Sequence, residues 1–130
     1  MKKILLGLAL ALAFCVPAYA QQLGQATALY SETATALTGS ATYTGSAHDV
    51  GPIPYYDQVG CVFRADQSGT AYLDMSADAS AWTVQATASV SANTTTDLNA
   101  RVRARFWRCR YVNGSTGQGS FAVFASATVS

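Results

Sequence analysis

Hydrophobic and polar residues alternate along most of the chain, which is the two-residue period of β-strands with one buried face. Ala71, Leu73 and Met75, for example, fall on one face of a predicted strand, and Tyr72 and Asp74 fall on the other. No stretch shows the 3.6-residue period of an amphipathic helix. The strands predicted in this way are 26–37, 40–43, 59–64, 70–75, 82–90, 101–112 and 119–129.

Turn-forming residues separate these strands at intervals of about ten positions, as in sandwiches and barrels. They include the loop Gly51-Pro52-Ile53-Pro54, which two prolines keep out of the centre of a sheet, and the turns 66–69, 76–80 and 113–117. Residues 91–96 read as a polar connection. The pattern predicts an all-β fold, an antiparallel two-sheet β-sandwich of jelly-roll or immunoglobulin-like type with about seven or eight strands.

The segment 101–112 changes its pattern halfway along. Apolar residues take even positions up to Phe106 and odd positions from Trp107 onwards. A single strand cannot keep both sets inside without an extra residue, so we predict a β-bulge near these two residues. The shift turns Cys109 inward, where it can meet an inward-facing Cys61.

The N-terminus has the three parts of a cleavable secretory signal. Two lysines precede an apolar run from Ile4 to Val16, and Ala18-Tyr19-Ala20 supplies the small residues that a signal peptidase needs. The run is shorter than the roughly 20 residues that span a bilayer. Phe14 stands where a lipoprotein peptidase expects a small residue, so lipidation of Cys15 is not expected.

We therefore assign residues 1–20 to a signal peptide and 21–130 to a single domain that is secreted, either extracellular or periplasmic. Cleavage removes both lysines and leaves six arginines against seven acidic residues, a net charge of −1. This balance argues against a general nucleic-acid binder. Cys61 and Cys109 form an even pair in an oxidising compartment, and the loop-entropy model gives about 4 kcal/mol for joining them.

Five of the six arginines lie between Arg101 and Arg110, all predicted to face outward. One interpretation is a cationic stripe that binds an acidic glycan, a phosphate or a membrane surface. The other is a solvated strand face whose charges pair with carboxylates on neighbouring strands, such as Asp74. We favour the second interpretation.

Tyr55 and Tyr56 follow a proline in a loop, and Tyr72 projects outward from its strand. Aromatic rings with a polar tip can stack on sugars or bind a partner protein, so these tyrosines, with Arg103 and Arg105, are the candidate ligand-binding residues. The alternative is that the loop aromatics cap the end of the sandwich. Trp82 and Trp107 are assigned to the core.

No catalytic or metal-binding constellation stands out, and we predict neither an enzyme nor a cofactor. His48-Asp49 contains the only histidine. A serine triad would need a nucleophile on a strained turn, and no G-x-S-x-G segment is present. One histidine and two paired cysteines do not make a zinc site. Asp66 and Asp78 lack the spacing of calcium-binding loops.

Three segments together resemble a small β-sandwich module of phage virion-associated proteins and bacterial secreted or surface proteins. They are Tyr43-Thr44-Gly45 with Asp49-Val50, Ala65 to Tyr72 with Ser76, Asp78 and Trp82, and Arg110 to Gly114 with Gln118 and Phe121. Ala79 stands where this pattern usually has glycine, and the cysteine pair is not part of it. The resemblance implies a structural or adhesive part without established catalysis.

Three functions follow, in order of preference. The first is a structural or adhesive module that self-associates, as a filament or surface-layer subunit, or decorates a surface. Residues 21–45 would then form an arm that donates a strand to a neighbour, unless they are a flexible tail. The second is a carbohydrate-binding module, and the third is a small secreted hydrolase or inhibitor.

Overall fold

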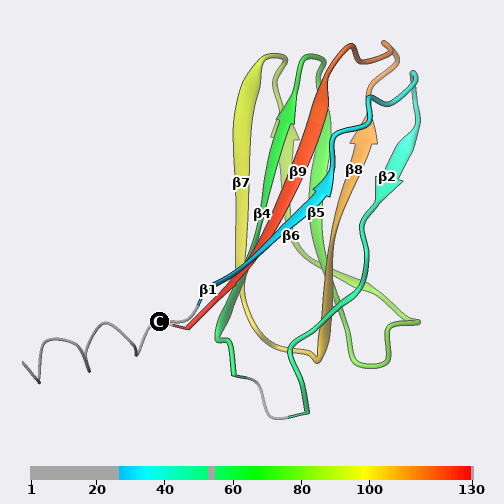
Figure 1. The fold of residues 1–130 in the computed structure, drawn as a ribbon. Helices are drawn as coiled ribbons and strands as arrows, with labels where there is room; N and C mark the ends of the chain where they lie inside the picture. The colour runs from blue at the N-terminus through cyan, green and yellow to red at the C-terminus, as the bar shows by residue number, and fades with distance from the viewer. Residues whose placement is uncertain (1–26, 53–54, 130) are drawn as a thin grey trace, which may run out of the picture.

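The computed structural model describes residues 27–52 and 55–129 and folds them into two facing antiparallel sheets (Figure 1). The predicted signal peptide, Cys15 and the first residues of the arm lie outside the described residues. The strands are β1 (Thr27–Thr33), β2 (Thr42–Thr44), β3 (His48–Asp49), β4 (Gln58–Ala65), β5 (Gly69–Ser76), β6 (Thr83–Val90), β7 (Thr94–Arg101), β8 (Phe106–Asn113) and β9 (Phe121–Thr128).

The strand order follows a nested pattern. Sheet 1 has the order β1-β9-β4-β7, and sheet 2 has the order β2-β8-β5-β6, with the short β3 also paired to β8. The pair β5–β6 lies inside β4–β7 along the chain, which lies inside β2–β8, which lies inside β1–β9. Successive pairs belong to alternate sheets. Counting β2 and β3 as one interrupted strand, this is the jelly-roll arrangement of eight strands.

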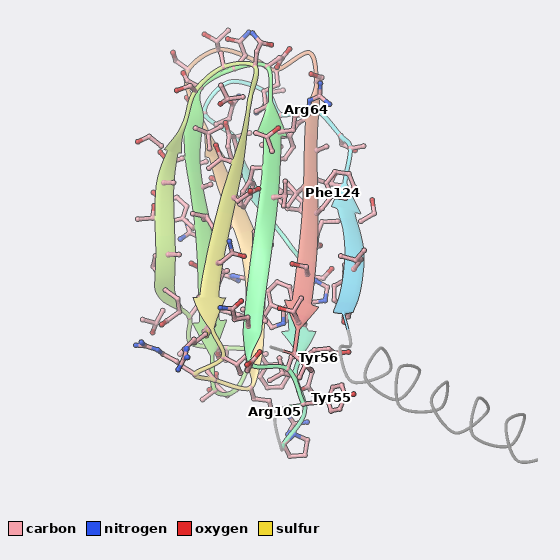
Figure 2. All side chains as sticks on the ribbon, turned by 90° about the vertical axis from the view of Figure 1, so that its left-hand side faces the viewer. Tyr55, Tyr56, Arg64, Arg105 and Phe124 are labelled. Carbon is pink, nitrogen blue, oxygen red and sulfur yellow. A yellow bond between two sulfur atoms is a disulfide. The ribbon has the colours of Figure 1, made fainter. Side chains whose placement is uncertain are left out.

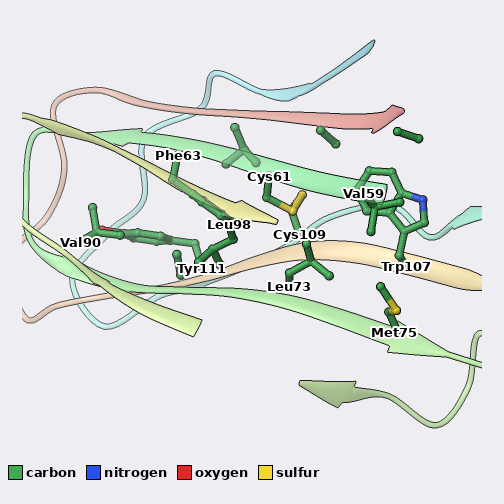
Figure 3. Close-up of a cluster of buried hydrophobic side chains, with 14 of the residues drawn as sticks. Val59, Cys61, Phe63, Leu73, Met75, Val90, Leu98, Trp107, Cys109 and Tyr111 are labelled. Atoms are coloured by element: carbon green, nitrogen blue, oxygen red, sulfur yellow. A yellow bond between two sulfur atoms is a disulfide. The ribbon is translucent and has the colours of Figure 1, made fainter. Parts of the chain in front are cut away.

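The core forms between the sheets from the inward positions of each strand (Figure 3). Phe63, Leu73, Trp107 and Tyr111 are among its largest apolar side chains, and all are almost completely buried. Their positions follow the two-residue period read from the sequence, because adjacent side chains on a strand point to opposite faces of the sheet. The alternation thus predicted most of the core correctly.

A disulfide joins the two sheets near the middle of the core. Cys61 lies on β4 of sheet 1 and Cys109 on β8 of sheet 2, and their Cα atoms are 5.9 Å apart. Both residues are buried. The inward orientation predicted for the two cysteines is correct.

The predicted bulge near Phe106 and Trp107 is wrong. Strand β7 ends at Arg101 in sheet 1, and β8 begins at Phe106 in sheet 2, so the chain crosses between the sheets at residues 102–105. From Phe106 onwards, β8 pairs with β5 without any shift of register. The change of parity therefore marks a change of sheet and not an extra residue in one strand.

Two other details of the strand prediction differ from the structure. The described residues contain nine strands, because the short segment β3 is separate and because 94–101, partly read as a polar connection, forms β7. The outward face of β7 is polar and its inward face holds Thr96, Leu98 and Ala100. Because this inward face holds so few large apolar residues, the alternation of β7 was hard to recognise in the sequence. No helix that is long and apolar enough to cross a membrane occurs in the described part of the chain.

The turn between β5 and β6 is built around Asp78. Its carboxylate accepts hydrogen bonds from the backbone N–H groups of Ser80 (2.9 Å) and Ala81 (3.0 Å) and from the Ser76 hydroxyl (3.0 Å). These bonds lower the pKa of Asp78 below its usual value, and the two backbone donors have a larger effect than the Ser76 hydroxyl. Ala79 has a φ of 62°, the left-handed conformation for which glycine is normally used.

Candidate binding surface

One end of the sandwich is formed by the crossover 102–105, the residues just before β4 and the residues just after β3. The backbone N–H of Val102 donates to the Asp57 carbonyl (2.9 Å), and that of Val50 donates to the Arg105 carbonyl (2.9 Å). Val102 and Ala104 pack against the core, so the arginines between and beside them project outward. We call this end the loop-end surface; it comprises Val50, Gly51, Pro52, Tyr55, Tyr56 and residues 101–105.

Arg105 is fixed in place by Asp49. Its Nε and Nη2 atoms donate to the two carboxylate oxygens of Asp49 at 3.0 and 2.9 Å. Asp49 also accepts a hydrogen bond from the N–H of Gly51 (2.7 Å). The hydrogen bonds from Arg105 are the main cause of an Asp49 pKa below its usual range. The guanidinium plane also lies over the Phe106 ring, 5.3 Å from its centroid.

Tyr55 and Tyr56 stand at the same end as Arg105 (Figure 2). Tyr55 is 64% exposed, whereas Tyr56 is half-buried against the core. Their rings meet edge to face with centroids 5.3 Å apart. Tyr56 therefore caps the sandwich, as one interpretation of the sequence expected, while Tyr55 presents its ring to solvent.

Two shallow depressions, each of about 270 Å³, flank Val102 on this surface. Pro52, Arg103 and Arg105 contribute to the wall of the first. Tyr56 and Arg101 contribute to the wall of the second. Within the described residues, the side chains of Arg101 and Arg103 are exposed and form no hydrogen bond or ion pair.

Tyr72 does not belong to the loop-end surface. It lies on the outer face of sheet 2, where the Arg110 guanidinium stacks on its ring at 4.0 Å. Arg110 donates two hydrogen bonds to Asp74 (2.8 and 3.2 Å), and Arg108 donates one to the same carboxylate (3.2 Å). Arg108 in turn covers the Trp82 ring at 4.2 Å.

These contacts explain why Asp74 is buried, at 1% exposure, although it points away from the core. The two arginines and two aromatic rings form a second layer over it. The expected carboxylate pairing therefore holds for Arg108 and Arg110. The assignment of Trp82 to the core is wrong, because a cation–π contact on the outer face buries it partly instead.

His48 lies on β3, on the side of β8 opposite to β5, in a cluster that links the two sheets. Its Nε2 atom bonds to the Glu32 carboxylate, which also accepts a hydrogen bond from the Tyr43 hydroxyl (3.1 Å). The imidazole stacks on Tyr30 (4.2 Å between centroids) and tilts against Trp107 (4.8 Å). Burial, followed by the negative charge of Glu32, raises the pKa of the Tyr43 hydroxyl.

His48 is next to Asp49 in the sequence, but its partner in the fold is Glu32. Glu32 comes from β1 of sheet 1, and His48 comes from β3 of sheet 2, so only the fold brings them together. The contact fastens the first strand to the opposite sheet. Within the described residues, no group of three or more histidine, cysteine or acidic side chains is placed to hold a metal ion.

The structure thus brings Tyr55, Tyr56, Arg103 and Arg105 to one end and leaves Tyr72 elsewhere. Arg101 and Pro52 join this surface. Arg101 belonged to the predicted stripe of outward arginines but not to the candidate ligand-binding residues, and Pro52 belonged to neither.

Comparison with protein families gives a match over most of the chain. Residues 18–128 match a family described as "Uncharacterised protein YqxG N-terminal domain". No curated protein sequence matches the chain.

Solved structures with the same architecture include the PBSX exported protein XepA, with a TM-score of 0.74 and 26% identity. The alignment covers 79% of this chain but 37% of the XepA chain, so this chain corresponds to well under half of that protein. The SPBc2 prophage-derived protein YomS shares the fold at a TM-score of 0.51 and 10% identity, over 80% of this chain and 94% of its own. The disulfide-linked pili of Bacillus endospore appendages, at a TM-score of 0.48 and 13% identity over 82% of this chain and 88% of theirs, are too distant to bear on function.

Proposed function

We propose that this chain, which belongs to the YqxG N-terminal domain family, is an exported, non-enzymatic structural module that self-associates or decorates a cell or particle surface. The likeness to XepA, which is described as an exported protein, supports export. The disulfide between the sheets also fits an oxidising compartment. The cluster around His48 supports a structural role, because this histidine serves to hold β1 against the opposite sheet.

The observation that carries self-association is the exposed edge at β1. Among the described strands, β1 pairs with β9 alone and lies at the end of sheet 1. Leu29 on β1 is 79% exposed, and Phe124 on β9 is 49% exposed. The register places Leu29 opposite Ser126 and Ser31 opposite Phe124, so the two apolar side chains are diagonal neighbours on the outer face.

Strand β1 lacks the features that usually protect a sheet edge from pairing with another chain. Its sequence, TALYSET, contains no lysine and no proline. Its one charged residue, Glu32, turns inward to His48 and Tyr43. Such an edge can accept a strand from a second copy, and Leu29 would then gain a cross-strand neighbour on the outer face.

Sedimentation velocity of the full-length protein over a range of concentrations tests this proposal. We expect oligomers that Leu29→Lys shifts towards monomer, because the lysine places a charge at the edge. Val84→Lys is the matched control, since Val84 is 45% exposed on β6 at an edge of the other sheet. A parent protein that stays monomeric at high concentration, or a Val84→Lys effect equal to that of Leu29→Lys, would exclude association through β1.

A further inference from the structure

We propose that the loop-end surface is a binding site for an acidic polysaccharide. The inference goes beyond the structural role above and does not depend on self-association, because Leu29 and Phe124 are not among the residues of the loop-end surface. It rests on the distribution of unpaired charge, on the shape of the surface and on its rigidity.

The positive charge that is free for a ligand is concentrated here. Arg105, Arg108 and Arg110 are engaged by Asp49 or Asp74. Arg101 and Arg103, in contrast, have no ionic partner among the described residues and extend from the same face of the crossover. A guanidinium group exposed in this way can bind a carboxylate or sulfate through two parallel hydrogen bonds.

The same surface offers apolar contacts between its charges. Val102 lies between the two depressions, Pro52 lines one of them, and the exposed Tyr55 ring stands at the same end. Rings with an apolar face and polar edges stack on aromatic side chains, and sugar rings have this character. Each depression is smaller and more open than the pockets that enclose small ligands, which have volumes of about 300–1,000 Å³. The surface therefore suits successive units of a chain lying across it.

The backbone of the crossover is also held in shape before any ligand arrives. Two backbone hydrogen bonds fasten the crossover to the residues before β4 and after β3, and the bidentate bond from Arg105 to Asp49 adds a third attachment. A backbone that is already ordered loses little conformational entropy on binding. Arg105 thus acts as a positioning residue, and Arg101 and Arg103 are left to contact the ligand.

A nucleic acid fits this surface less well. Nucleic-acid affinity grows with the number of phosphates neutralised, and about six to ten such contacts are common. Two free arginines supply too few of these contacts. A polymer that combines anionic groups with apolar ring faces uses both kinds of contact that the surface offers.

Biolayer interferometry on the full-length protein tests the proposal with four polymers. Polygalacturonate carries carboxylates, dextran sulfate carries sulfates, dextran is the neutral counterpart of the second, and polyphosphate is an anion without sugar. We expect binding to polygalacturonate, dextran sulfate or both at physiological salt, and much weaker binding to dextran and polyphosphate. The affinity falls as ionic strength rises, because exposed charges are screened.

The variants have a matched control within the same sandwich. Arg103→Ala and Tyr55→Ala each weaken binding by about tenfold, the effect expected from losing one charged hydrogen-bonding group or one stacked ring. Arg64→Ala leaves it unchanged. Arg64 is exposed beside a depression of about 300 Å³ at the other end of the sandwich, away from the loop-end surface (Figure 2).

Several results would overturn the proposal. They are the absence of binding to both acidic polysaccharides, equally tight binding to dextran or polyphosphate, and an Arg64→Ala effect as large as that of Arg103→Ala. Unchanged binding in Tyr55→Ala would also overturn it, because the ligand would then use charge alone. If Leu29→Lys does not alter the oligomers, only the proposal of self-association through β1 is refuted, and the proposal of polysaccharide binding is unaffected.

Discussion

Reduction of the Cys61–Cys109 bond is expected to remove a large part of the stability of the fold. The two cysteines are separated by 48 positions in the sequence, and loop-closure entropy for that length gives about 4 kcal/mol. A domain of this size has a free energy of unfolding of about 5–15 kcal/mol. Because the bond connects sheet 1 to sheet 2, its loss leaves packing and the cluster around Glu32 and His48 to hold the layers together.

Guanidinium titration of the full-length protein with and without a reductant measures this effect. We expect the free energy of unfolding to fall by about 4 kcal/mol and the slope of the transition to increase, because the reduced unfolded chain is more expanded. The variant with Cys61→Ala and Cys109→Ala lacks the disulfide, as the reduced protein does, and also lacks the two buried sulfur atoms. A further decrease in that variant, beyond the effect of reduction, measures the cavity separately.

The oxidised protein provides the control. Its mass without reductant is expected to be lower by about two hydrogens than its mass after reduction, as the formation of a disulfide requires. Two free thiols in folded protein from an oxidising compartment would show that the cysteines do not meet as described. An unfolding midpoint that does not change on reduction would refute the entropic reasoning.

Other predictions concern the polar contacts. Asp74→Asn is expected to lower the free energy of unfolding by about 3 kcal/mol in urea titrations, because it leaves two arginines without their buried carboxylate. Glu32→Gln is expected to lower it by about 1 kcal/mol and to speed hydrogen exchange in β1. The lowered pKa of Asp78 stabilises the fold above its usual pKa of 3.8, so stability is lost as the pH falls below that value, and Asp78→Asn reduces this dependence in acid titrations. Ala79→Gly is expected to raise the thermal midpoint, with a gain of up to about 1 kcal/mol, by relieving the left-handed conformation.

The sequence was sufficient to predict the strands that bury large residues. Phe63, Leu73 and the odd-numbered residues from Trp107 to Tyr111 occupy alternate positions of their strands, and all of them are buried as that alternation predicted. Strand β7 was harder to find, because Leu98 is its one large inward residue and its hydroxyl and amide side chains also suit a loop. Periodicity is thus informative in proportion to the apolar surface that a strand buries.

The errors arose where a local pattern had two geometric explanations. A change of parity at Phe106 fits either a bulge or a transfer to another sheet, and only the pairing partners distinguish them. Trp82 looked like a core residue by its size, but the neighbouring Arg108 offers it a cation–π contact outside the core. For the candidate surface, the sequence indicated single residues such as Tyr55 and Arg103 but not that they lie at the same end. They come together through a crossover between the sheets that the sequence does not reveal.

The nesting of the strand pairs also determines the length of the loop that must close when each pair forms during folding. The hairpin of β5 and β6 joins residues close in sequence, whereas β1 and β9 pair Thr27 with Thr128 across nearly the whole described chain. Loop-closure entropy grows with this separation, and folds dominated by distant contacts form slowly. We expect β1 to be the last strand to dock. A newly made molecule would therefore present β9 as an open edge for a time, and during that interval a β1 strand from another molecule could occupy it as readily as its own.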